Sequence, residues 1–103
     1  MEEKIRILVL DRGFCLVCRC VNPMEFGFWI PVHDARIIRR WGTTNGLGEL
    51  CNNGPKRETV LDEMIEQETI PTRAIIRVLE VNQESWEAHL KPSAKRTRRT
   101  VAS

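Results

Sequence analysis

The residues best suited to chemistry gather in positions 34–54, DARIIRRWGTTNGLGELCNNG. Arginines, an indole and a loop rich in glycine and threonine follow one another there. Guanidinium forks and free backbone N–H groups are what hold phosphate-like anions in proteins, and an indole can stack on a base or a cation. The candidate ligand-binding residues are therefore Arg36, Arg39, Arg40, Trp41, Thr43, Thr44 and Asn45.

A structural role for the same segment is the competing interpretation. An acidic run lies further along the chain, at Asp62, Glu63, Glu66 and Glu68. The arginines can pair with these carboxylates, while Trp41 anchors the core and the glycines form turns. The sequence leaves both interpretations open.

The cysteines of CLVCRC, residues 15–20, have the look of a metal knuckle, with Cys51 as the remaining thiol. On a strand, however, Cys15 points away from Cys18 and Cys20. Structural zinc sites usually take their ligands as two pairs of nearby residues, whereas Cys51 has no second cysteine close to it in the sequence. We therefore expect four free thiols that act as small apolar core residues, with no metal and no cofactor.

Catalysis would need a nucleophile, a base and an orienting group in one constellation. His33 stands next to Asp34, but no GxSxG, HExxH or GxxxxGK motif surrounds either histidine. We expect His33 to lie at a strand end and the protein not to be an enzyme.

The C-terminal composition differs from that of the rest of the chain. Residues 91–103 carry five of the 16 Lys and Arg residues and no acid, which leaves 11 basic and 14 acidic residues in 1–90, a net charge of about −3 for this part. A uniformly basic nucleic-acid surface on that part is therefore not expected. The tail itself is a candidate nucleic-acid site, with salt-sensitive and sequence-blind affinity, through Lys95, Arg96, Arg98 and Arg99.

The length of 103 residues fits one globular domain at 1–90 followed by a basic tail at 91–103. A core of this size is marginal, so we expect a homo-oligomer whose interface adds burial. The N-terminus has no secretory apolar region, and no stretch approaches the ~20 apolar residues of a membrane span. These features predict a cytoplasmic protein without membrane contact.

Hydrophobic periodicity predicts an α+β fold, a mainly antiparallel sheet or partly open barrel of five to six strands. The strands are expected at 4–10, which should be central, and at 14–21, 26–32 and 74–81. Residues 33–41 can be strand or helix, and their isoleucines favour a strand. A short helix should follow Trp41, capped by Thr43 or Thr44 and ended by Gly54, and Asn82 should cap a second helix at 83–90.

Two positions within this scheme are less regular. Pro31 cannot donate a ladder hydrogen bond, so we expect it at a sheet edge or a strand end. Residues 55–72 open with a turn at 55–57, and Val60, Leu61, Met64 and Ile65 can form a strand or a single helical turn.

One pattern resembles a known family. Ala35-Arg36, Ile38, Trp41, Leu47, Leu50 and Gly54, with hairpin-like strands before them and AIIRVLEV after them, are similar to a family of small uncharacterised proteins encoded by bacteriophages and prophages. Members carry more aromatic residues where this chain has Arg39 and Arg40, so this chain is more cationic. The resemblance implies a bacterial virus or its host as the source.

Together these features lead to an expected function. We expect a non-enzymatic phage protein with a counter-defence role, which sequesters a nucleotide-like anionic host signal or blocks a host defence protein. The anion would bind at residues 36–48. The alternative is an accessory DNA- or RNA-binding protein that uses the basic tail.

Overall fold

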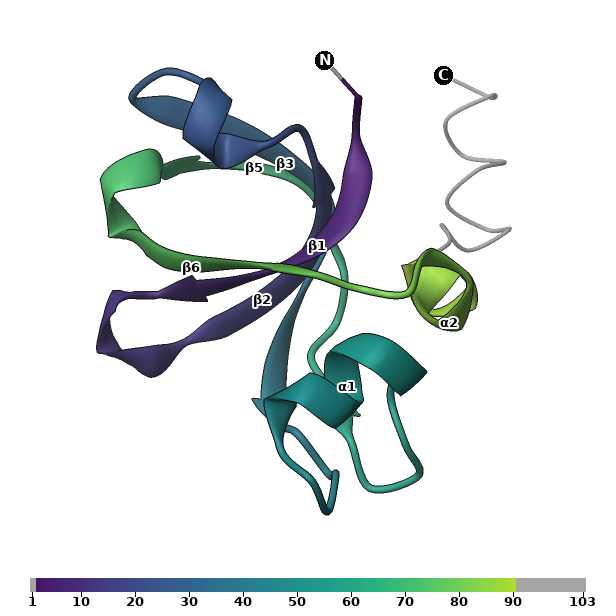
Figure 1. The fold of residues 1–103 in the computed structure, drawn as a ribbon. Coiled ribbons are helices and arrows are strands. Elements are labelled where there is room, and N and C mark those ends of the chain that lie inside the picture. Colours follow the sequence, from purple (N-terminus) through teal and green to yellow (C-terminus); the bar gives the residue numbers. More distant parts are fainter. Residues whose placement is uncertain (1, 91–103) are drawn as a thin grey trace.

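The computed structural model describes residues 2–90 and shows a six-stranded antiparallel sheet with two short helices on one face (Figure 1). The strands are β1 (Lys4–Leu10), β2 (Cys15–Cys20), β3 (Trp29–Arg40), β4 (Val60–Leu61), β5 (Ile65–Pro71) and β6 (Ile75–Glu80). The helices are α1 (Leu47–Asn53) and α2 (Gln83–Glu87), and the 3-10 turns are η1 (Asp11–Gly13), η2 (Pro23–Glu25), η3 (Thr72–Ala74) and η4 (Ala88–Leu90). The predicted small α+β fold is confirmed.

The strand order is β4-β3-β2-β1-β6, and β5 also pairs with β3. Strand β3 is long enough to hold two partners on one edge, with β5 along Trp29–Ala35 and β4 along Ile38–Arg40. The turn η3 joins β5 directly to β6, although these strands lie at opposite ends of the order. The sheet is therefore strongly bent, as Figure 1 shows.

The hairpin of β1 and β2 lies in the centre of the sheet and buries both of its faces, which confirms the predicted central position of the strand at 4–10. One face packs against the helices in a cluster that includes Ile7, Val17, Leu50, Trp86 and Leu90. The opposite face packs inside the bend of the sheet in a second cluster that includes Leu8, Leu16, Ile30, Val32 and Ile70. The bent sheet is thus a layer between two cores.

Residues 29–40 form one strand, where the sequence suggested a strand at 26–32 and a separate element at 33–41. The strand prediction for 33–41 is confirmed, but Phe26, Gly27 and Phe28 precede β3 and are not part of it. Val32 and Ala35 face the same cluster although they are three residues apart. The alternation breaks at Asp34, whose φ is 52°, and the pairing with β2 shifts register there. A β-bulge of this kind redirects every later side chain.

Pro31 lies inside β3 and not at its end, which corrects one part of the expectation. It pairs with Thr69 of β5, whereas the pairing with β2 begins only at His33. The proline is tolerated because this part of β3 has a ladder partner on one side only.

Asn82 caps α2 as predicted, because its side-chain oxygen accepts a hydrogen bond of 3.1 Å from the Ser85 N–H. Helix α2 continues through η4, so that Trp86 and Leu90 both lie fully buried against the sheet. The i, i+4 spacing of these two residues places them on one helical face.

Helix α1 ends as predicted, since Gly54 has a φ of 81° and its N–H bonds to the Leu50 carbonyl. Its beginning was predicted wrongly. The N-cap is Gly46 without a side-chain bond, and the Thr43 hydroxyl instead donates to the Gly46 carbonyl at 2.7 Å. The hydroxyl of Thr43 is therefore used in a hydrogen bond within the loop, and the helix begins after this loop, at Leu47.

Candidate anion-binding site

Arg36 is held by three main-chain carbonyls. Its Nε donates to the Asp62 carbonyl at 2.8 Å, Nη1 to His89 at 3.1 Å and Nη2 to Leu61 at 3.4 Å. All three acceptors are neutral, and within residues 2–90 no carboxylate forms an ion pair with this guanidinium. The fork is thereby oriented while its positive charge stays uncompensated in this part of the chain.

Arg36 lines a pocket of about 360 Å³. This volume lies within the range of small-molecule sites, about 300–1,000 Å³. Two cationic side chains, Arg36 and Lys56, contribute to it, and the lining contains no carboxylate. The lining residues are Arg36, Pro55, Lys56, Thr59, Val60, Leu61 and His89.

A tight turn positions the far wall of this pocket. The Thr59 N–H bonds to the Lys56 carbonyl at 3.1 Å, and the Lys56 N–H bonds to the Thr59 hydroxyl at 2.8 Å. The same hydroxyl donates to the Trp41 carbonyl, which ties the turn to the end of β3. Strand β4 then pairs with β3 at Ile38 and Arg40, and its residues Val60 and Leu61 line the pocket together with Arg36.

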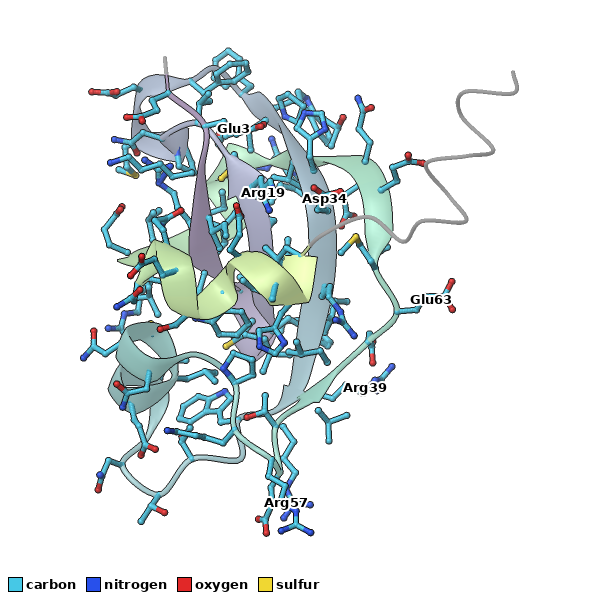
Figure 2. The ribbon with its side chains drawn as sticks, turned by 90° about the vertical axis from the view of Figure 1, so that its right-hand side faces the viewer. Glu3, Arg19, Asp34, Arg39, Arg57 and Glu63 are labelled. Carbon is cyan, nitrogen blue, oxygen red and sulfur yellow. The ribbon has the colours of Figure 1, made fainter. Side chains whose placement is uncertain are left out.

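The neighbouring arginines are used differently. Arg39 forms an ion pair with the Asp62 carboxylate, and its side chain is 69% exposed (Figure 2). Arg40 is exposed, and in the part of the chain that the structure describes it forms no ion pair. Of the three arginines, only Arg36 lines the pocket.

The loop residues do not line the pocket of Arg36. Trp41 is 41% exposed and reaches the site only through its carbonyl. The Asn45 N–H, which the sequence suggested for an anion, is occupied by the Glu49 carboxylate at 2.8 Å. Thr43 bonds within the loop, and Thr44 is exposed. The structure thus brings Arg36 together with residues 55, 56, 59–61 and His89, and not with residues 43–45.

The pairing of arginines with the acidic run is realised only in part. Asp62 pairs with Arg39, but it offers Arg36 a backbone carbonyl and not its carboxylate. The structural and the ligand-binding interpretations therefore apply to different arginines.

The four cysteines are free and buried, as predicted. Cys15 and Cys51 face the cluster below the helices, while Cys18 and Cys20 face the other one. The Cys18 thiol donates to Cys20 Sγ at 3.9 Å, which raises the pKa of Cys18 and lowers that of Cys20. Burial raises the pKa of Cys51. In residues 2–90 no cluster of three or more His, Cys, Asp or Glu could hold a metal ion.

His33 lies in the middle of β3, which corrects its expected place at a strand end. Its Nε2 is 3.5 Å from a Glu3 carboxylate oxygen. Nearby, Arg19 bridges Asp34 at 3.2 Å and Glu87 at 2.8 Å, which joins the bulge of β3 to α2 (Figure 2). These contacts connect strands and a helix and form no nucleophile–base pair.

The basic tail residues Lys95, Arg96, Arg98 and Arg99 lie outside the described residues. Within residues 2–90 no helix is long and apolar enough to cross a membrane.

Comparisons with protein-family models, curated proteins and solved structures give no match. Fold and pocket together define a small α+β protein with a cationic cavity at the end of its longest strand.

Sequence reasoning missed most of the pocket lining. Pro55 and Lys56 were predicted only as part of a turn, and His89 only as part of the C-terminal helix. A usable signal was the proline-led turn between Gly54 and the β4 strand, because such turns often carry binding residues on a rigid scaffold.

Proposed function

We propose that this is a non-enzymatic binding protein whose pocket at Arg36 holds a small phosphate-bearing anion, such as a nucleotide. One observation carries the proposal: a guanidinium fixed by neutral carbonyls at the wall of a cavity that no carboxylate lines. Arginine has five N–H donors, and three of them are used internally. The remaining donors and the full charge are available to a ligand.

The anchoring favours binding for a physical reason. A free arginine side chain loses conformational entropy when it grips a ligand, on the order of 0.5–1.5 kcal/mol. Here the carbonyls of Leu61, Asp62 and His89 already hold the fork in one orientation. Charge-assisted bonds to phosphate are roughly twice as strong as neutral ones, and Lys56 adds a second cation at the same cavity.

The resemblance to small bacteriophage proteins supports a biological setting for this activity. A phage protein that binds a nucleotide-like host signal lowers its free concentration and so acts in counter-defence. Such a protein needs no catalytic group, because two cations and a hydroxyl at the cavity are sufficient to bind an anion.

The experiment that tests the proposal compares two adjacent cations. Lys56 lines the pocket, whereas Arg57 is an exposed neighbour that does not line it. We expect Lys56→Ala to weaken binding of a nucleoside monophosphate or a cyclic dinucleotide about tenfold, which corresponds to about 1.4 kcal/mol. Arg57→Ala should bind like the parent. Isothermal titration calorimetry measures both, and the melting temperatures should stay equal because both side chains are exposed.

Two results would contradict the site. One is an absence of binding for inorganic phosphate and for both nucleotides at low ionic strength. The other is an equal loss in both variants, which would indicate a diffuse electrostatic attraction. A chain shortened after residue 91 serves as a further control, because its unchanged affinity would exclude the tail as the binding element.

Arg36→Ala is a less discriminating test than Lys56→Ala. It removes three hydrogen bonds to carbonyls, two of them part-buried and one exposed, and a typical bond contributes about 0.5–1.5 kcal/mol. We therefore expect this variant to lose both anion affinity and several degrees of melting temperature. Arg36→Lys retains the charge without the fork, and a large loss of affinity in this variant would indicate bidentate recognition.

A further inference from the structure

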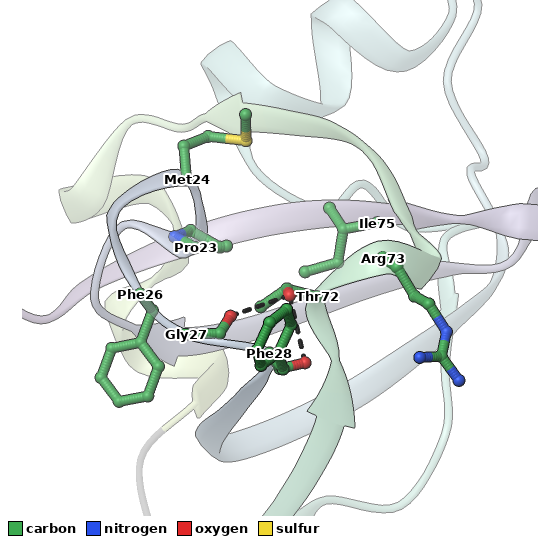
Figure 3. Close-up of a pocket in the computed structure, with 8 residues that line it drawn as sticks. All are labelled: Pro23, Met24, Phe26, Gly27, Phe28, Thr72, Arg73 and Ile75. Atoms are coloured by element: carbon green, nitrogen blue, oxygen red, sulfur yellow. Dashed lines mark hydrogen bonds between the residues drawn. The ribbon is translucent and has the colours of Figure 1, made fainter.

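Six consecutive residues, 24–29, are exposed where the chain passes from β2 into the first residue of β3, and four of them are large and apolar. Met24 is 78% exposed, Phe26 42%, Phe28 87% and Trp29 56%. We name these four side chains the 24–29 surface. Three of them, Met24, Phe26 and Phe28, line a groove of about 440 Å³ that Thr72, Arg73 and Ile75 also line (Figure 3).

Hydrogen bonds hold the backbone of this segment in place. The Asn22 side chain accepts from the Met24 N–H at 3.0 Å, and the Phe26 N–H bonds to the Pro23 carbonyl at 3.3 Å. From the other side, the Thr72 hydroxyl donates to the carbonyls of Gly27 and Phe28, the two dashed lines of Figure 3. The apolar side chains are thus displayed on a supported loop, which lowers the entropy lost when a partner covers them.

The exposed apolar area is large for a chain of this size. Side chains such as these cover about 150–250 Å² each when buried, so their exposed fractions amount to roughly 500 Å². Two such surfaces in contact bury about 1,000 Å², the area that a specific protein interface needs. Monomeric proteins rarely expose an apolar patch of this size to solvent unless it binds a partner.

Charge also favours a second copy of the chain over an unrelated partner. Glu25 lies in the turn that carries the 24–29 surface, and Arg73 lines the groove on its opposite side. Both residues are exposed, and within residues 2–90 neither forms an ion pair. In a contact with two-fold symmetry, Glu25 of each protomer can meet Arg73 of the other, so the surface is complementary to itself.

We propose that the 24–29 surface is the interface of a homodimer, with Phe28 and Met24 seated in the groove of the second copy and Glu25 paired with its Arg73. This interface adds apolar burial to a fold that has a small core. It is independent of the anion pocket, because none of its residues lines that cavity.

The oligomeric mass of the full chain tests this proposal. Light scattering or sedimentation equilibrium should give twice the 11.9 kDa chain mass and a fall toward the monomer on dilution. The double variant Met24→Ser, Phe28→Ser should be monomeric throughout. The matched control is Phe14→Ser, an equally apolar change at a side chain 58% exposed in a different turn, and it should remain dimeric.

A charge exchange tests the symmetry of the contact. Arg73→Glu places like charges opposite each other and should weaken dimerisation at least tenfold, while adding Glu25→Arg should restore it. A monomeric parent at every concentration overturns the proposal, as does a dimer that survives Met24→Ser, Phe28→Ser. Failure of the double reversal to restore the dimer overturns the Glu25–Arg73 pairing. Circular dichroism verifies that each variant is folded.

Discussion

Replacing Trp86 with alanine is expected to lower the free energy of unfolding by about 3–5 kcal/mol, the usual cost of removing a buried large side chain. Trp86 is fully buried between the sheet and α1, and its Nε1 donates to the Leu50 carbonyl at 3.1 Å. The substitution therefore opens a cavity and removes one of the two hydrogen bonds to the Leu50 carbonyl, which keeps the one from the Gly54 N–H. Small domains are stable by only about 5–15 kcal/mol, so this loss is a large part of the total.

Urea denaturation followed by circular dichroism measures the effect. Trp41→Ala is the matched control, because the same side chain is 41% exposed there and its deletion should cost far less. Trp86→Phe separates the two contributions, since it keeps most of the volume and removes the N–H donor. Equal destabilisation by Trp41→Ala and Trp86→Ala would contradict the assignment of Trp86 to the core.

The second large effect is expected at Gly42, where β3 has ended. Its φ is 67°, and a Cβ built on it overlaps the backbone of Glu58 and Thr59. Gly42→Ala must therefore displace the turn that forms the far wall of the Arg36 pocket. We expect a loss of roughly 2–5 kcal/mol, from the left-handed conformation and from the overlap, together with weaker anion binding.

Gly46→Ala separates these two causes. Gly46 has a similar φ of 84°, but no atom lies within 4 Å of its added Cβ. Its ψ is −162°, so it should lose about 1–3 kcal/mol, the cost of a backbone conformation that residues other than glycine rarely adopt. If the two variants have the same stability in urea and the same affinity in calorimetry, the close approach of the 56–59 turn to Gly42 is not important.

Gly42 also shows why a glycine-rich loop is ambiguous in sequence. The pattern Gly42 to Gly48 suggested backbone amides left open for an anion. In the structure Gly42 makes room for another segment of the same chain, and Asn45 gives its N–H to Glu49. A glycine allows another group to approach its backbone closely, but the sequence does not indicate whether that group is a ligand or another segment of the chain.

Local patterns were sufficient for much of the fold. Apolar residues on both faces of the strand at 4–10 predicted that it is central, because side chains of a strand alternate strictly. The same alternation separated Cys15 from Cys18 and Cys20. The cap of the last helix could be predicted from Asn82, and its buried face from the spacing of Trp86 and Leu90. Both features depend only on residues within one or two helical turns.

Contacts between distant segments decided the rest. The bulge at Asp34 shifts the register against β2, so the side chains after it could not be assigned to a face by counting along β3. The pocket joins Arg36 to residues 55, 56 and 59–61 and to His89, 53 positions away. The exposure of Phe28 depends on where η3 meets the loop before β3. Hydrophobic periodicity indicates on which face of its own strand or helix a residue lies. Which other element packs against that face depends on the tertiary structure of the whole chain.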